Sequence, residues 1–205
     1  MENKVVEPAN TVSYAVKVSL EVREELERAR SRHNSAVTSL PTTWSKPDVG
    51  WTKVNVDAGV LGDTGTGIGM VMRDSEGVIV ACSSWQGTEK WETRVAEAKA
   101  VAMGLQLAQE MGVRDVEMES DCLMVIQPLR GGSQGNNSFS LVIDDILDLC
   151  SSFDNDNVKW SFVKRSGNWV AHNLAHFQPW NFGQRVWVND VPNDVLNVGF
   201  SDLLI

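Results

Sequence analysis

Cysteine, long apolar runs and positive charge are all scarce in this chain of 205 residues. Its three cysteines, Cys82, Cys122 and Cys150, include no Cys-x-x-Cys pair, which argues against a zinc ribbon or a disulfide framework and favours a reducing compartment, the nucleus or the cytoplasm. No apolar run approaches the ~18 residues of a membrane span. The first residues also lack the basic start and apolar stretch of a secretory signal. We therefore expect an intracellular protein with no membrane partner.

The charge of the chain is unevenly distributed. Lysine and arginine total 18 against 27 aspartates and glutamates, which gives a net charge of −9. The first 50 residues carry 7 basic and 7 acidic side chains, so the negative excess lies in residues 51–205. Proteins that coat nucleic acid neutralise phosphates with lysine and arginine, and this balance excludes that class. Any contact with nucleic acid must be local or bridged by metal ions.

Three segments are expected along the chain. Residues 1–43 are rich in Glu, Arg and Leu with a thin apolar stripe, which predicts a helical or partly disordered leader. A helix that binds a protein partner is the alternative interpretation of this segment. The composition changes between Pro41 and Pro47, and residues 44–192 are expected to form the folded domain, followed by a C-terminal tail at 193–205. We expect a monomer.

From residue 51 onward, strand-like alternation and helical periodicity follow one another in the order β-β-β-α-β-α-α-β-α. The predicted strands are 51–58, 66–72, 78–84, 113–121 and 158–164, and the predicted helices are 93–111, 122–129, 139–153 and 168–177. Three successive strands predict an antiparallel meander, and strands reached through helices are expected to run parallel to the first. The sequence thus predicts an α/β fold, a mixed five-stranded sheet flanked by helices.

Three carboxylates occupy positions where a metal site could form. Asp57 ends the first predicted strand and Asp121 the fourth. If these strands are parallel neighbours, ~5 Å apart, both carboxylates lie at the sheet edge where open α/β sheets bind ligands. Glu97 heads the sheet-facing side of the first helix, and an inward glutamate is costly unless a charge or a metal pairs with it. Each residue alone has an ordinary explanation as a turn residue, an N-cap or a surface side chain, but the combination indicates a metal site.

An ordered set of motifs runs through the chain. They are Trp44-x-x-Pro47-x-x-Gly50-Trp51-x-Lys53-x-Asn55-x-Asp57, Gly67-Ile68-Gly69 with Arg73-Asp74 and Gly77, Ala96-Glu97-Ala98, Glu119-Ser120-Asp121, and Asn168-x-x-Ala171-His172-x-Leu174-Ala175. From about Trp44 to Pro192 the set resembles the plant ribonuclease H-like domain family, which is related to the ribonuclease H domains of non-LTR retroelements. The resemblance implies the ribonuclease H-like fold, which agrees with the predicted order of elements.

The resemblance also implies an activity, the endonucleolytic hydrolysis of RNA paired with DNA. The family's catalytic carboxylates fall on Asp57, Glu97 and Asp121, which would hold Mg²⁺ or Mn²⁺. Two such ions, ~3.5–4 Å apart, can activate a water and stabilise the leaving 3′-oxygen. Carboxylate oxygens are the ligands that these hard cations prefer.

The fourth metal position departs from the family. Related enzymes carry Asp in the last helix, where this sequence has His172, and imidazole suits Mn²⁺ or Zn²⁺ better than Mg²⁺. The resemblance implies that His172 is the fourth catalytic and metal-binding residue, and a hydrogen bond near the helix start is the alternative. His176 lies one turn further on, but no His-Glu-x-x-His motif surrounds the pair. We therefore interpret His176 as a surface or packing residue.

Few residues are available to hold a nucleic-acid substrate. In some relatives a basic, Trp-rich protrusion holds the hybrid, but the matching segment 130–156 has one basic residue, Arg130, and five aspartates. Weak substrate binding by the isolated domain is therefore expected. The candidate substrate contacts are Asn55, Lys164, Arg165 and Asn168. Two main functions stay open: an active ribonuclease for RNA–DNA hybrids, or a catalytically weak or inactive module of the same fold that binds nucleic acid or protein. A third, weaker option is another nuclease of the superfamily that acts on single strands or junctions.

Overall fold

The computed structural model describes residues 43–62, 65–132, 135–153, 157–177, 182–188, 191 and 193. Apart from residues 43 and 193, the predicted leader and C-terminal tail lie outside this described part. Its elements are β1 (Thr52–Leu61), β2 (Gly65–Arg73), β3 (Ile79–Gly87), α2 (Thr93–Glu110), β4 (Val116–Ser120), α3 (Leu123–Gly131), α4 (Ser138–Cys150), β5 (Val158–Phe162), the short 3-10 helix η1 (Arg165–Gly167), α5 (Trp169–His176) and β6 (Gly183–Val188). None of the described helices combines the length and hydropathy that crossing a membrane requires.

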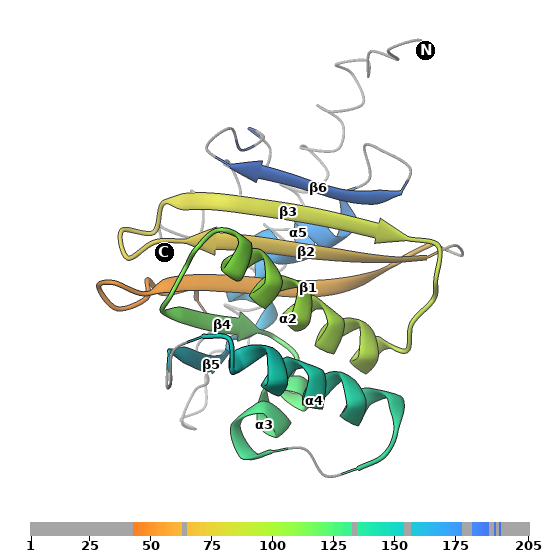
Figure 1. Ribbon diagram of the computed structural model, residues 1–205. Coiled ribbons are helices and arrows are strands. Elements are labelled where there is room, and N and C mark those ends of the chain that lie inside the picture. Colours follow the sequence, from red (N-terminus) through yellow and green to blue (C-terminus); the bar gives the residue numbers. More distant parts are fainter. Residues whose placement is uncertain are drawn as a thin grey trace, which may run out of the picture. The chain divides into compact units, whose positions relative to one another are not determined.

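The described strands form one sheet in the order β5-β4-β1-β2-β3-β6 (Figure 1). The meander of β1, β2 and β3 is antiparallel, and β4 and β5 continue the sheet in parallel from β1. This confirms the predicted mixed α/β architecture. The sheet has six strands where the sequence predicted five, because residues 183–188 pair antiparallel with β3. That strand depends on the open hydrogen-bonding edge of β3 rather than on its own pattern of side chains.

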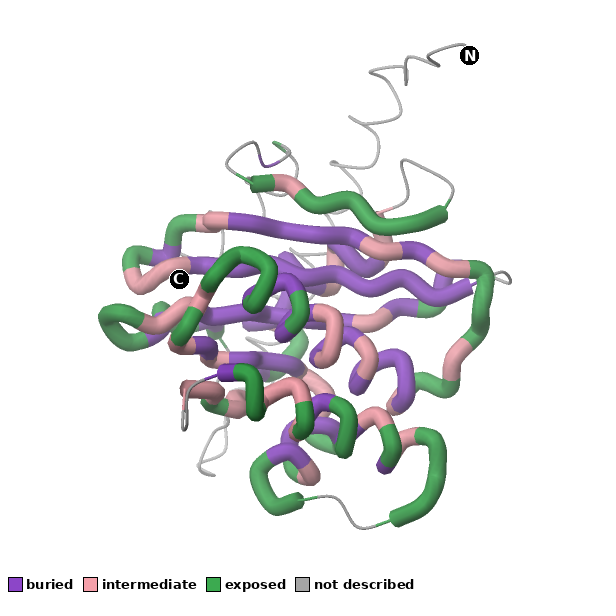
Figure 2. Tube along the Cα trace, viewed as in Figure 1, coloured by how far each residue is buried: buried purple, intermediate pink, exposed green. Residues whose placement is uncertain are grey.

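Helices cover both faces of the central strands. In Figure 1, α2 and α4 lie in front of the sheet and α5 lies behind it. Alternate residues of β1 and β2, such as Val56 and Met70, join the core under α2, whereas Val71 packs with Leu174 of α5 on the opposite face. Figure 2 shows the consequence: β2 is buried along its whole length, while the edge strand β6 is mostly exposed.

Two glycines of β2 let the backbone of α5 lie directly on the sheet. A Cβ at Gly69 would clash with the Ala171 carbonyl oxygen and the Ala175 amide nitrogen, and a Cβ at Gly67 would clash with the Ala175 carbonyl oxygen. The sequence favoured this close approach over phosphate binding, because no helix follows these glycines directly. Gly69 is also the register partner of Asp57 on β1. The contact therefore sets the height of α5 above the strand that carries Asp57.

The close approach of α5 predicts the effect of one added methyl group. Gly69→Ala should lower the free energy of unfolding by about 3 kcal/mol or more, because the obstructing atoms are helix backbone and cannot rotate away. Gly131→Ala is the matched control, since a Cβ there would meet nothing within 4 Å; its effect should stay within about 0.5 kcal/mol. Urea denaturation measures both variants. Equal stabilities would contradict the role given to Gly69.

Candidate metal centre

Asp57, Glu97 and Asp121 converge from three elements of the fold. The last residue pair of the parallel ladder between β1 and β4 is Val56 with Ser120. Asp57 and Asp121 are the next residues of their chains, so both lie at the end of this ladder. Glu97, in the second turn of α2, is buried against the sheet. One carboxylate oxygen from each of the three residues lies within 4.8 Å of the other two. The acids that the sequence singled out are thus brought together in the structure.

The position of Asp57 within its strand differs from the prediction. The sequence placed Asp57 at the end of the first strand, but β1 continues to Leu61 because its pairing with β2 extends that far. Only the pairing with β4 stops before Asp57. Asp57 is consequently held on one side by the β2 ladder, and its side chain is completely buried.

Burial and mutual repulsion perturb the titration of these carboxyls. Burial, together with the negative charges of Asp57 and Asp121, raises the pKa of Glu97 to about 9. Burial also raises the pKa of Asp57, and it raises that of Asp121 to about 6 with help from the charge of Asp57. Each of these carboxyls therefore binds protons more readily than in water, as expected where positive charge is scarce.

Two oxygens of this group lack partners. Asp57 Oδ1 and Glu97 Oε2 are buried and accept no hydrogen bond from the described residues. Unpaired buried oxygens are rare in folded proteins because each carries an uncompensated desolvation cost. A divalent cation that prefers oxygen ligands would compensate both oxygens. The donor set therefore fits a hard divalent cation.

The partly exposed guanidinium of Arg165 lies beside two of the three carboxylates. Its Nε is 2.6 Å from Asp121 Oδ2, and its Nη1 is 3.4 Å from Asp57 Oδ2. Its charge lowers the pKa of both carboxyls, against the larger effect of burial. Arg165 was predicted to contact phosphate, and in the structure it supplies positive charge to the carboxylates. Because its side chain is 43% exposed, it can turn outward without unpacking the core.

Two further candidate substrate contacts are bonded inside the protein. Asn168 Nδ2 donates to Asp121 Oδ1 at 3.1 Å and to the Val56 carbonyl oxygen at 2.8 Å. Asn55 Nδ2 donates to Glu119 Oε1 at 2.9 Å and to Asn168 Oδ1 at 3.2 Å. Both asparagines are almost completely buried. They orient the Asp121 carboxylate, and their contact with a substrate stays a prediction, as does that of the exposed Lys164.

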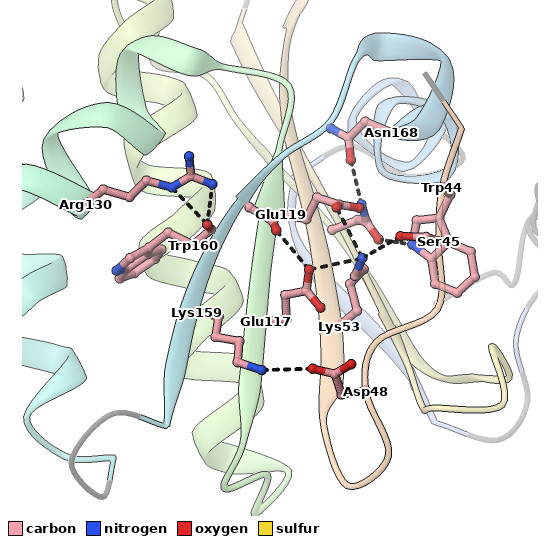
Figure 3. A network of polar contacts seen from close by, with 12 residues as sticks. Trp44, Ser45, Asp48, Lys53, Glu117, Glu119, Arg130, Lys159, Trp160 and Asn168 are labelled. Atoms are coloured by element: carbon pink, nitrogen blue, oxygen red, sulfur yellow. Dashed lines mark hydrogen bonds and ion pairs between the residues drawn. The ribbon is translucent and has the colours of Figure 1, made fainter. Parts of the chain in front are cut away.

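A second ionic cluster, absent from the sequence interpretation, lies next to these asparagines (Figure 3). Lys53 Nζ is 3.2 Å from both Glu117 Oε1 and Glu119 Oε2. Trp44 covers the cluster, with its Nε1 donating to Asn55 Oδ1 at 2.9 Å. The signal for this cluster was present in the sequence, because polar or charged residues alternate with Val54 and Met118 along the two strands. Register decides the pairing by placing Lys53 opposite Glu117.

The helix α5 brings two histidines to Asp57. His172 Nδ1 is 2.9 Å from Asp57 Oδ2 and also contacts Arg165 Nη1. His176 is half-buried, and its ring centroid lies 4.4 Å from that of His172. One ligand atom each from Asp57, His172 and His176 can be chosen within 4.8 Å of one another. His176, interpreted from sequence as a surface or packing residue, thus lies in a second group around Asp57.

Comparison with known proteins identifies the class to which this fold and site belong. Residues 55–178 match the family described as reverse transcriptase-like, and the chain belongs to that family. It is 31% identical over 145 residues to an Arabidopsis thaliana protein whose name assigns it to the ribonuclease H proteins. The match covers 65% of this chain and 21% of the relative, so the chain spans about a fifth of that protein. The resemblance inferred from the motifs is confirmed.

Solved structures confirm the ribonuclease H-like fold. Ribonuclease H1 of the archaeon Halobacterium salinarum aligns with a TM-score of 0.56 and 24% identity, covering 61% of this chain and 94% of that one. The N-terminal ribonuclease H domain of a Mycobacterium tuberculosis protein aligns with a TM-score of 0.55 and 18% identity, and the alignment covers 75% of this chain and 98% of that one. LC11-RNase H1 was isolated from compost by a metagenomic approach, and its structure was solved in complex with an RNA/DNA hybrid. It aligns with a TM-score of 0.54 and 22% identity, and the alignment covers 60% of this chain and 92% of that one.

The raised pKa of Glu97 predicts how stability depends on pH. The folded state binds a proton that the unfolded state releases between the usual pKa of 4.5 and about 9. The stabilising contribution is therefore complete below the lower value and is lost as the pH rises through the higher one. In the presence of a chelator, the free energy of unfolding should fall over this range, by at most about 1.4 kcal/mol per pH unit from one carboxyl.

Substitution of the same residue tests this assignment. Glu97→Gln should flatten the slope of unfolding free energy against pH, because the amide does not titrate. Glu110→Gln, at the exposed end of the same helix, should leave the slope unchanged. Urea unfolding at a series of pH values measures all three proteins. A wild type that gains stability as the pH rises would contradict the assignment.

Proposed function

We propose that this domain is a metal-dependent endoribonuclease that hydrolyses the RNA strand of RNA–DNA hybrids. The observation that carries the proposal is the buried group of Asp57, Glu97 and Asp121, two of whose oxygens accept no hydrogen bond from the part of the chain that the structure describes. Support comes from the name of the Arabidopsis relative and from the hybrid bound to LC11-RNase H1, which shares the fold.

Asp57, Glu97, Asp121 and His172 would hold the Mg²⁺ or Mn²⁺ that the reaction needs. Three of these residues offer carboxylate oxygens, and His172 offers an imidazole nitrogen. Bound ions of this kind make water nucleophilic near neutral pH and stabilise the negative charge of a leaving oxygen.

The remaining polar residues orient the carboxylates and receive the substrate. Asn168 bridges Asp121 and the backbone of β1, so the Asp121 carboxylate keeps one orientation. Arg165, released from the carboxylates when a cation takes its place, would turn to a phosphate oxygen of the substrate. The exposed Lys164 beside it would add a second positive charge. Both residues are exposed and directly precede α5 in the chain, apart from the short turn that leads into it.

A catalytically weak or inactive module is the second candidate, and the distribution of charge favours it. Arg130, the one basic residue in segment 130–156, donates from Nε and Nη2 to the Trp160 carbonyl oxygen at 3.0 and 2.6 Å. The neighbouring α4 exposes Asp144, Asp145 and Asp148. This surface repels phosphate, so the isolated domain should hold a hybrid weakly. Such a module would bind nucleic acid or protein without turnover.

A hybrid-cleavage assay distinguishes the two candidates. The wild type should cleave the RNA strand with Mg²⁺ or Mn²⁺, and Asp57→Asn should reduce the rate by about 10³-fold, because the neutral amide is a poor ligand for either ion. Asp144→Asn, an exposed change on α4, is the control and should cleave like the wild type. A wild type that binds hybrid but remains inert with both metals would support the module instead.

His172 predicts a difference between the two metals. His172→Asp should raise Mg²⁺ affinity and Mg²⁺-supported cleavage by about tenfold, because carboxylate replaces a neutral nitrogen beside a hard cation. His172→Ala should reduce cleavage less than Asp57→Asn does. Calorimetric titration with Mg²⁺ and Mn²⁺ measures the affinities directly. Unaltered metal affinity in His172→Asp would mean that His172 only makes a hydrogen bond near the start of α5.

A further inference from the structure

We propose that His176 is a metal ligand, and that Asp57, His172 and His176 form a nitrogen-rich cation site that prefers Zn²⁺, Co²⁺ or Mn²⁺ over Mg²⁺. The three residues can offer ligand atoms within 4.8 Å of one another. The inference rests on the proposed metal-dependent nuclease, because the site shares Asp57 and His172 with the proposed Mg²⁺ or Mn²⁺ site, and its new element is His176. It can nevertheless be tested by metal binding alone.

A hydrogen bond fixes which nitrogen of His176 is available. His176 Nδ1 lies 2.9 Å from the carbonyl oxygen of His172. A carbonyl oxygen can only accept, so Nδ1 carries the proton and the neutral ring has its lone pair on Nε2. Metal-binding histidines characteristically donate a hydrogen bond from the N–H of the other ring nitrogen to a carbonyl or carboxylate in this way. The imidazole of His176 is therefore held in the tautomer that a metal ligand at Nε2 requires.

Gly59 of β1 has no side chain, and the Nε2 edge of the His176 ring occupies the space that a Cβ would take. A Cβ at Gly59 would lie 2.6 Å from His176 Nε2, so any larger residue would push the imidazole away. Gly59 follows Asp57 by two residues, and alternate residues of a strand face the same side of the sheet. The Nε2 edge of His176 thus lies against the same face of β1 that presents Asp57.

The three residues together offer one carboxylate and two imidazole ligands. His172 Nδ1 is 2.9 Å from Asp57 Oδ2, and Asp57 Oδ1 has no hydrogen-bond partner among the described residues. Ligand atoms of a tetrahedral ion bound at about 2.0–2.2 Å lie roughly 3.4 Å apart, and each of the three residues offers a ligand atom within 4.8 Å of the other two. Two imidazoles with one carboxylate favour borderline cations, whereas three carboxylates favour Mg²⁺.

Arg165 is the charged group that faces this site. Its Nη1 contacts both His172 Nδ1 and Asp57 Oδ2, so the guanidinium must leave those atoms when a cation binds. The Arg165 side chain is 43% exposed and can do so. The negative charges of Glu97 and Asp121, which lie close to Asp57, attract the cation.

Two variants of the full chain test the role of His176. His176→Asn keeps an amide donor for the His172 carbonyl but lacks Nε2, and Gly59→Ala keeps both imidazoles but displaces the ring. Asn173→Ala, on the same helix, is the matched control because the Asn173 side chain donates to the Trp169 carbonyl and not to a residue of the proposed site. Co²⁺ is the probe, read by its visible absorption, and calorimetry with Zn²⁺ and Mg²⁺ measures affinity.

Loss of Nε2 should weaken Co²⁺ and Zn²⁺ binding by about tenfold or more and shift the Co²⁺ absorption, since one nitrogen ligand is lost. Gly59→Ala should act in the same direction, and Mg²⁺ affinity should change much less. The proposal is overturned if His176→Asn and Asn173→Ala bind Co²⁺ alike, or if Mg²⁺ and Co²⁺ affinities fall equally.

The outcome is separable from the proposed function. A wild type that binds Co²⁺ through His176 but cleaves no hybrid with Mg²⁺ would uphold the nitrogen-rich site and contradict the nuclease. Hybrid cleavage with Mg²⁺, without His176-dependent Co²⁺ binding, would uphold the nuclease and contradict the nitrogen-rich site.

Discussion

Direct contact between the backbone of α5 and strand β2 fixes the geometry on which the candidate metal centre depends. Gly67 and Gly69 allow the helix to approach to a distance at which no side chain fits between them. Since Gly69 is paired with Asp57, this approach also determines how far His172 and His176 lie above β1. A thicker layer between α5 and β2 would separate both histidines from the buried carboxylate.

Two acidic clusters are compensated in different ways. Glu117 and Glu119 share the buried ammonium of Lys53 under the cover of Trp44, so their positive partner is a permanent part of the core. Asp57, Glu97 and Asp121 have no such buried cation among the described residues, and Arg165 reaches two of them from the surface. A buried charge without a fixed partner costs stability, as expected where function rather than folding selects the residues. The contrast indicates that the positive charge beside Asp57, Glu97 and Asp121 can be exchanged for another cation.

Local patterns in the sequence determined most of the architecture. Alternation and helical periodicity gave five strands and the helices between them, because both signals depend on neighbours within a few residues. The position of each acid within these elements was enough to group Asp57, Glu97 and Asp121. Gly67 and Gly69 indicated close backbone approach before the helix that approaches them was known, because glycine inside a strand has few other uses.

Only the tertiary structure decided which distant side chains meet. Strand β6 forms because β3 offers an open edge, and Asp57 lies inside β1 because pairing with β2 continues beyond it. Arg165 turns to the carboxylates, and His176 joins Asp57 across more than a hundred residues of sequence. Register and helix height set these contacts, and both result from packing of the whole sheet. A periodicity that spans a few residues carries no information about either.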